Sequence, residues 1–85
     1  MTDQRILEIG AGQSPDPRAT ETLDIRTDLE HIDYGGVDIG ADEWPVEDDS
    51  VDQVIANHVL EHVPPERIGD VFSEVDRVVR PVALS

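Results

Sequence analysis

The stretch R-I-L-E-I-G-A-G-Q-S, residues 5–14, decides how this chain is organised. Its apolar run at 6–9 is too short for a helix and is typical of a buried parallel strand. Gly10-Ala11-Gly12 follows at once, and glycine permits positive φ and close approach of a ligand to the main chain. The stretch therefore predicts a strand that opens into a nucleotide or nucleoside cradle. The alternative is an ordinary strand and glycine-rich turn, because a short Gly-x-Gly is weak evidence without its context.

Glu8 interrupts the apolar run just before the turn. A carboxylate in a buried strand is costly unless it has a partner. Its place at the end of the strand, beside the glycines, therefore indicates a hydrogen-bonding role or a ligand.

Size and composition limit the classes of protein to consider. The chain has 85 residues and no cysteine, so we expect one small domain without disulfides or thiolate metal ligands. No apolar run approaches the length of a membrane span, and the N-terminus lacks the apolar segment of a signal peptide. These features predict a soluble, cytoplasmic protein.

The charge is strongly negative. Twenty acidic residues face six basic ones, all arginine, which gives a net charge of −14. This argues against binding to nucleic acid or to anionic membranes. The acids are spread between apolar runs, which favours a folded acidic protein of halophilic type over a disordered acidic tail. Because salt screens the repulsion, we expect the melting temperature to rise with KCl concentration.

The remaining pattern predicts an α/β fold with about four mostly parallel strands and a C-terminal amphipathic helix. Pro15 and Pro17 exclude a regular helix after the first turn. The predicted strands are 6–9, 22–25, 37–40 and 51–57, and 82–85 resembles the start of another. The predicted helices are a short one at 27–34 and a longer one at 66–79, whose apolar residues form a single stripe.

Taken together in their order along the chain, these motifs resemble those of the class I S-adenosylmethionine-dependent methyltransferases, and most closely the type 11 methyltransferase domain. The matching pieces are ILEIGAG at 6–12, LDI at 23–25, GADEWPVEDDSVDQVIANHVLEHV at 40–63 and EVDRVVRP at 74–81. The resemblance implies a partial Rossmann-like methyltransferase fold in a single domain, residues 1–85. It also implies S-adenosylmethionine as the cofactor.

The resemblance assigns site residues one by one. The segment from Glu8 through Gly10, Ala11 and Gly12 would cradle the methionine and ribose part of the cofactor. Asp24, at the end of the second strand, would accept hydrogen bonds from the ribose hydroxyls.

Further along the chain, the resemblance implies that Asp42 takes the adenine amino group, with Glu43 and Trp44 flanking the ring. Asn57 and His58 would line the pocket near the transferred methyl group. Catalysis can rest on holding donor and acceptor in line, so no catalytic residue and no metal ligand is assigned. His58 and His62 are the candidates for a base if the acceptor must lose a proton.

The family domain continues beyond the R-P motif, whereas this sequence ends at Ser85. The resemblance therefore implies the cofactor half without the acceptor half, and an unknown methyl acceptor. The fourth predicted strand would form an exposed sheet edge, a site for pairing with another chain such as a second copy.

Two alternatives to an active methyltransferase remain open. One is a non-catalytic, truncated module of the same fold that binds the cofactor or a partner chain. The other is a zinc protein, because His58-x-x-Glu61-His62 fits the H-x-x-E-H pattern in which two histidines on one helix grip the metal. Against this, Pro64 and Pro65 interrupt the helix directly after the pattern.

Overall fold

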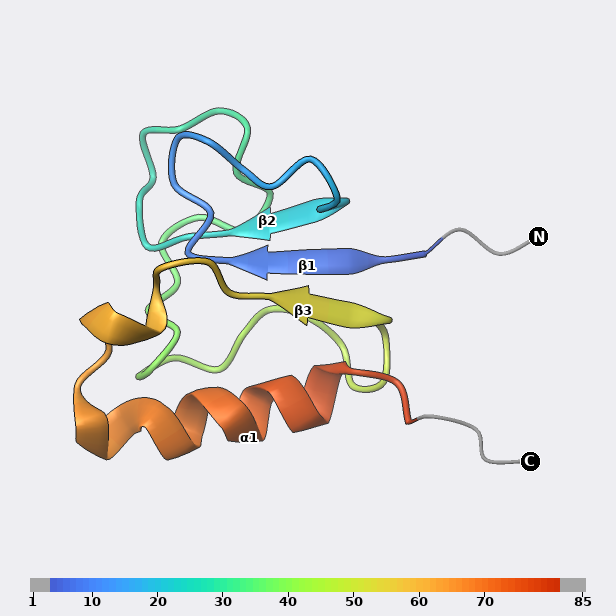
Figure 1. The fold of residues 1–85 in the computed structure, drawn as a ribbon, viewed down its shortest axis with the longest axis vertical. Coiled ribbons are helices and arrows are strands. Elements are labelled where there is room, and N and C mark those ends of the chain that lie inside the picture. Colours follow the sequence, from blue (N-terminus) through green and yellow to red (C-terminus); the bar gives the residue numbers. More distant parts are fainter. Residues whose placement is uncertain (1–3, 82–85) are drawn as a thin grey trace.

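The computed structural model describes residues 4–81. A parallel sheet with strand order β2-β1-β3 pairs Leu7 with Glu21 on one side and with Val54 on the other. Figure 1 shows the strands pointing the same way, with the C-terminal helix on the side of β3. The elements in chain order are β1 (Ile6–Ile9), β2 (Glu21–Leu23), β3 (Gln53–Ile55), the 3₁₀ turns η1 (Leu60–His62) and η2 (Pro65–Arg67), and α1 (Ile68–Val78).

The parallel sheet and the C-terminal helix agree with the predicted partial Rossmann-like architecture. The number of strands does not: residues 4–81 contain three, and the predicted strand at 37–40 is a turn. The carbonyl of Asp38 accepts hydrogen bonds from the backbone N–H groups of Ala41 and Asp42, and the Asp42 carboxylate accepts one from the Asp38 N–H. These local bonds curl the segment and compete with strand pairing. The predicted strand at 82–85 lies outside the described residues.

The short helix predicted at 27–34 is also wrong, because the end of this segment bonds to β2. Tyr34 forms a parallel bridge with Leu23, with Tyr34 N donating to the Thr22 carbonyl and Asp24 N donating to the Tyr34 carbonyl. The Asp33 carboxylate accepts a hydrogen bond from Thr22 N at 2.9 Å. A non-local contact therefore overrides a local helical pattern.

The two faces of β1 differ in chemistry. Leu7 and Ile9 belong to one buried apolar cluster, and strand alternation places Ile6 and Glu8 on the opposite face. That second face is bonded to loops rather than covered by a helix: Glu8 accepts a hydrogen bond from Asp16 N at 2.7 Å. The core cluster consists of Leu7, Ile9, Leu23, Val37, Ile39, Trp44, Val46, Val51, Val71 and Val78.

α1 is tied to the segment of residues 44–48 that runs beside it (Figure 1). The Arg77 guanidinium donates to the carbonyls of Trp44 and Val46, to the Asp48 carboxylate, and to both oxygens of Glu74. Glu74 also accepts a hydrogen bond from Trp44 N at 2.7 Å. Arg77 thus holds the core segment around Trp44 against the helix.

The hydrogen bonds between Arg77 and Glu74 should make the stability of the protein depend on pH. Hydrogen bonds from Arg77 lower the pKa of Glu74 below its ordinary value of 4.5. A carboxyl group with a lowered folded-state pKa stabilises the protein above its ordinary pKa, and this contribution is lost as the pH falls below it. The excess stability of the wild type over Glu74→Gln, measured by urea unfolding, should be largest near neutral pH and shrink below pH 4.5.

Glu66→Gln is the charge-matched control, because Glu66 lies in η2 with an exposed side chain. A wild-type advantage over Glu74→Gln that stays constant from neutral to acidic pH would contradict this role for Glu74.

On the side of the sheet nearer α1, β3 is an edge strand. Just before it, Val51 forms a parallel bridge with Val79, and Arg80 N donates to the Val51 carbonyl at 2.8 Å. The chain leaving α1 therefore lies beside the residues that lead into β3. Within residues 4–81, no helix combines the length and the apolar character that crossing a membrane requires.

Candidate cofactor site

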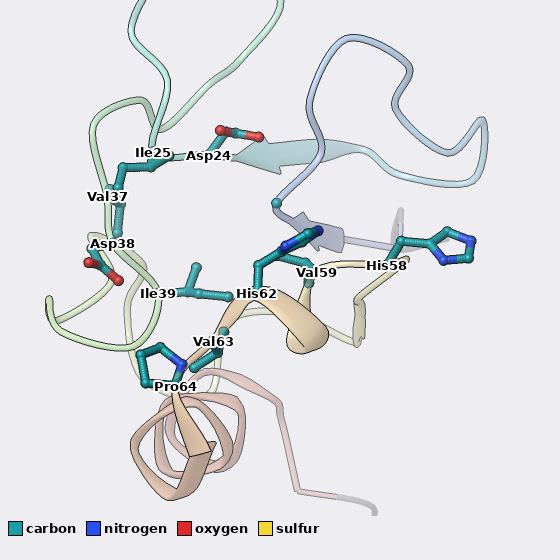
Figure 2. Close-up of a pocket in the computed structure, with 11 residues that line it drawn as sticks. Asp24, Ile25, Val37, Asp38, Ile39, His58, Val59, His62, Val63 and Pro64 are labelled. Carbon is teal, nitrogen blue, oxygen red and sulfur yellow. The ribbon is translucent and has the colours of Figure 1, made fainter. Parts of the chain in front are cut away.

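A cleft of about 370 Å³ lies where the chain leaves β1, β2 and β3. This is the carboxyl end of a parallel sheet, where open α/β folds bind their ligands. Its volume falls in the range of small-molecule sites, about 300–1,000 Å³. Its lining, drawn in Figure 2, consists of Gly10, Asp24, Ile25, Val37, Asp38, Ile39, His58, Val59, His62, Val63 and Pro64.

Asp24 is the buried carboxylate of this cleft. It follows β2 directly and is only 7% exposed. One of its oxygens accepts a hydrogen bond from Gly12 N at 2.7 Å, and the other accepts one from Arg26 N at 2.9 Å. Each oxygen keeps a second lone pair, so Asp24 is oriented by the backbone and can still accept hydrogen bonds from a ligand.

Asp38 is a second carboxylate in the same cleft, and the sequence did not point to it. Val37 N donates to the Asp24 carbonyl at 3.2 Å, which brings residues 37–39 beside the end of β2. The turn at 38–42 then presents the Asp38 side chain, one oxygen of which accepts a hydrogen bond from Gly40 N at 3.1 Å. Figure 2 shows Asp24 and Asp38 on the same side of the cleft, with Val37 between them.

The glycine turn after β1 contributes Gly10 to the lining of the cleft. Gly10 has a φ of +65°, and its N–H donates to the Leu23 carbonyl at 2.7 Å. A Cβ atom at Gly10 would lie 2.7 Å from the Cβ of Val59, closer than real Cβ contacts. The chain after β3 therefore packs directly on the glycine turn, and only glycine fits there.

Two histidines stand at the opposite wall. His58 has a φ of +54°, and its side chain is 94% exposed. In Figure 2 its ring extends away from the cleft, whereas His62 extends from η1 toward the side where Asp24 lies. The backbone of His58 thus lines the cleft, and His62 is the imidazole that faces it.

The cleft combines two carboxylates with apolar walls. Its lining includes no arginine, so the site is suited to a ligand that offers hydrogen-bond donors or positive charge. Such a ligand must also present apolar or aromatic surface to Val37, Ile39 and Val59. A nucleoside carrying a cationic group meets these requirements.

The comparison with known families agrees with this chemistry. The family model described as "Methyltransferase domain", of type 11, matches residues 15–84. The chain belongs to the class I S-adenosylmethionine-dependent methyltransferases. Members of this family generally use S-adenosylmethionine. A search of curated proteins and a search of solved structures found no match.

The methyltransferase domain does not gather all the predicted site residues in one hollow. Gly10, Asp24 and His58 line the cleft, whereas Ala11, Gly12 and Asn57 are not part of its lining. Ala11 is buried behind the turn, and Gly12, with a φ of +62°, serves the cleft indirectly by bonding Asp24.

Glu8 of the methyltransferase domain is buried, only 2% exposed, but it does not line the cleft. The partner that a buried carboxylate requires is the Asp16 N–H. Glu8 therefore holds the loop at 10–20, which joins β1 to β2 in place of the helix that usually connects two parallel strands.

Asp42 and Glu43 lie in a separate, smaller cleft of about 230 Å³ against α1. Trp44 does not flank an open ring site, because it is 1% exposed in the core, where its Nε1–H donates to the Ile39 carbonyl at 3.2 Å. The turn at 38–42 explains the separation. It directs Asp38 into the main cleft and Asp42 and Glu43 toward the helix.

The described residues give no support to the zinc alternative. Over residues 4–81, no group of three or more His, Cys, Asp or Glu side chains is arranged to hold a metal ion. The Glu61 carboxylate lies 3.9 Å from His58 Nδ1 and 4.0 Å from His62 Nε2, and all three side chains are exposed.

Proposed function

We propose that the cleft holding Asp24 and Asp38 binds S-adenosylmethionine and serves methyl transfer to an acceptor. The observation that carries the proposal is that these two carboxylates, several apolar side chains and Gly10 line one cleft at the carboxyl end of the sheet. Family membership supplies the reaction class, and the hydrogen-bond acceptors of the cleft supply the fit.

The hydrogen-bond donors of S-adenosylmethionine match the acceptors of the cleft. Ribose hydroxyls are hydrogen-bond donors, and Asp24 has acceptor capacity left after its two backbone bonds. The exocyclic amine of adenine is another donor, and Asp38 is the carboxylate available to it in this cleft. We therefore assign to Asp38 the role that the family resemblance implied for Asp42. Ile25, Val37 and Ile39 offer the apolar surface against which a base can lie.

When bound, S-adenosylmethionine supplies an activated methyl group on a sulfonium centre. The chain's own part is to orient this group, to exclude water with the apolar wall, and to attract positive charge with its carboxylates. Where an acceptor must lose a proton, His62 is the imidazole that faces the cleft.

Calorimetry with S-adenosylmethionine, at low and high KCl, tests the proposal. We expect Asp24→Asn and Asp38→Asn each to weaken binding about tenfold, because each removes a charged acceptor while keeping the shape of the side chain. Glu43→Gln is the matched control: it removes the same charge from the smaller cleft and should change the Kd by less than about twofold.

Two outcomes would overturn the assignment. One is the absence of binding by the wild type at either salt concentration. The other is an equal loss of affinity in Glu43→Gln and Asp38→Asn, which would indicate a general effect of charge. Binding without methyl transfer to any acceptor would instead support a cofactor-binding module over an enzyme.

A further inference from the structure

Glu8 and Asn57, which the family resemblance assigned to the cofactor, make hydrogen bonds to the same third residue. Asp16 N donates to the Glu8 carboxylate at 2.7 Å, and Asn57 Nδ2 donates to the Asp16 carboxylate at 3.1 Å. Asp16 thus connects the end of β1 with the chain just after β3, although 41 residues separate it from Asn57.

These bonds are part of a closed circuit around the carboxyl end of β1. From Glu8 the main chain leads to Gly10, which is packed against Val59. From Val59 the main chain leads back to Asn57, which bonds Asp16, which bonds Glu8. We call Glu8, Gly10, Asp16, Asn57 and Val59 the Asp16 circuit. Two of its members, Gly10 and Val59, line the cleft, and the other three do not.

Asp16 itself is held firmly in this position. Arg18 donates to both of its carboxylate oxygens, from its backbone N–H and from its guanidinium, at 2.9 to 3.0 Å. These bonds lower the pKa of Asp16 well below its ordinary value of 3.8, so its side chain is an ionised acceptor for Asn57. The side chain of Asp16 is only 11% exposed, whereas that of Arg18 is 64% exposed.

From this geometry we propose that Asp16 is a positioning residue for the cofactor site. It fixes the turn at residues 57–59 against the glycine turn, and through it Glu8 and Asn57 act on the cleft without touching the ligand. The inference rests on the proposed function, because its effect is read as affinity for S-adenosylmethionine.

Calorimetric titration of the 85-residue chain with S-adenosylmethionine tests the inference. Asp16→Ala keeps the N–H that bonds Glu8 but removes the acceptor for Asn57. We expect the Kd to rise about tenfold in Asp16→Ala, and by a similar factor in Asn57→Ala. The double variant should bind no more weakly than either single one, because both break the same link. Asp16→Asn should recover most of the affinity, since its amide oxygen still accepts from Asn57.

Asp28→Ala is the matched control. Like Asp16, Asp28 pairs with an arginine two residues away, Arg26, but it lies outside the circuit. It should leave the Kd within about twofold of the wild type. All titrations are made at temperatures where unfolding curves show each variant to be folded, so that a loss of stability is not read as a loss of affinity.

A ligand-free measurement separates this inference from the proposed function. In NMR spectra, Asp16→Ala should shift the methyl signals of Val59 and the amide signal of Gly10, and Asp28→Ala should not. Wild-type affinity in Asp16→Ala, or unchanged Val59 and Gly10 signals, would overturn the inference while leaving the cofactor assignment standing. A wild type that binds no S-adenosylmethionine would overturn the cofactor assignment and, with it, the role of Asp16 in binding.

Discussion

Replacement of Gly10 by alanine is expected to lower the free energy of unfolding by about 3 kcal/mol, from positive-φ strain of about 1–2 kcal/mol and a further cost for overpacking. The strain follows from a φ of +65°, and the overpacking from Val59, whose Cβ lies 2.7 Å from the position of an added Cβ. Urea unfolding followed by circular dichroism measures the change. Because Val59 also lines the cleft, binding of S-adenosylmethionine should be lost as well.

Two other glycines separate the causes of this effect. Gly12 also has a positive φ, +62°, but a Cβ there meets nothing within 4 Å, so Gly12→Ala should cost only about 1–2 kcal/mol. Gly69 lies in α1 with equally open space around it, so Gly69→Ala should stabilise the chain by about 0.5–1 kcal/mol. Equal losses in Gly10→Ala and Gly12→Ala would show that contact with Val59 contributes nothing.

Replacement of Trp44 by alanine is expected to cost about 4 kcal/mol, in the range of large-to-small substitutions of buried aromatic residues. Trp44 is among the largest fully buried side chains, and it also donates a hydrogen bond to the Ile39 carbonyl at 3.2 Å. Its loss should therefore disturb the wall of the cleft as well as the core. Circular dichroism is the suitable probe of unfolding, because Trp44 is the only tryptophan of the chain.

Phe72 is the matched control for this substitution. It is an aromatic residue of α1, but it is 55% exposed. Phe72→Ala should cost less than about 1 kcal/mol, since little apolar surface is returned to water. A loss in Phe72→Ala as large as that in Trp44→Ala would contradict the core described above.

The pattern of apolar residues was sufficient to predict the first strand and the C-terminal helix. The apolar run before the glycines became β1, and the apolar stripe near the C-terminus became α1. Asp24, to which the family resemblance assigned the ribose hydroxyls, is the buried carboxylate of the cleft.

The errors all involve contacts between distant residues or backbone bonds made by acidic side chains. Residues 27–34 have a helical pattern, but Asp33 and Tyr34 bond to β2. Residues 37–40 look like a strand, but Asp38 and Asp42 bond the backbone and make a turn. In a chain with twenty acids, composition alone cannot tell which carboxylates cap turns and which face a ligand.

The same limit applies to Glu8 and Asn57. The family resemblance implied that both bind the cofactor, yet both bond to Asp16, which lies in a proline-containing loop without a periodic pattern. Trp44, placed beside acids in the sequence, became a core residue because Glu74 and Arg77 of α1 bond its backbone.

An NMR titration of the isotope-labelled chain with S-adenosylmethionine tests most directly which cleft binds the nucleoside. We expect the amide signals of Gly10, Ile25, Asp38 and Ile39 to shift together and saturate at one Kd, while those of Glu43 and Ser73 in the smaller cleft stay in place. Shifts centred on Glu43 and Ser73, or no saturable shift at any residue, would contradict the assignment of the Asp24 and Asp38 cleft.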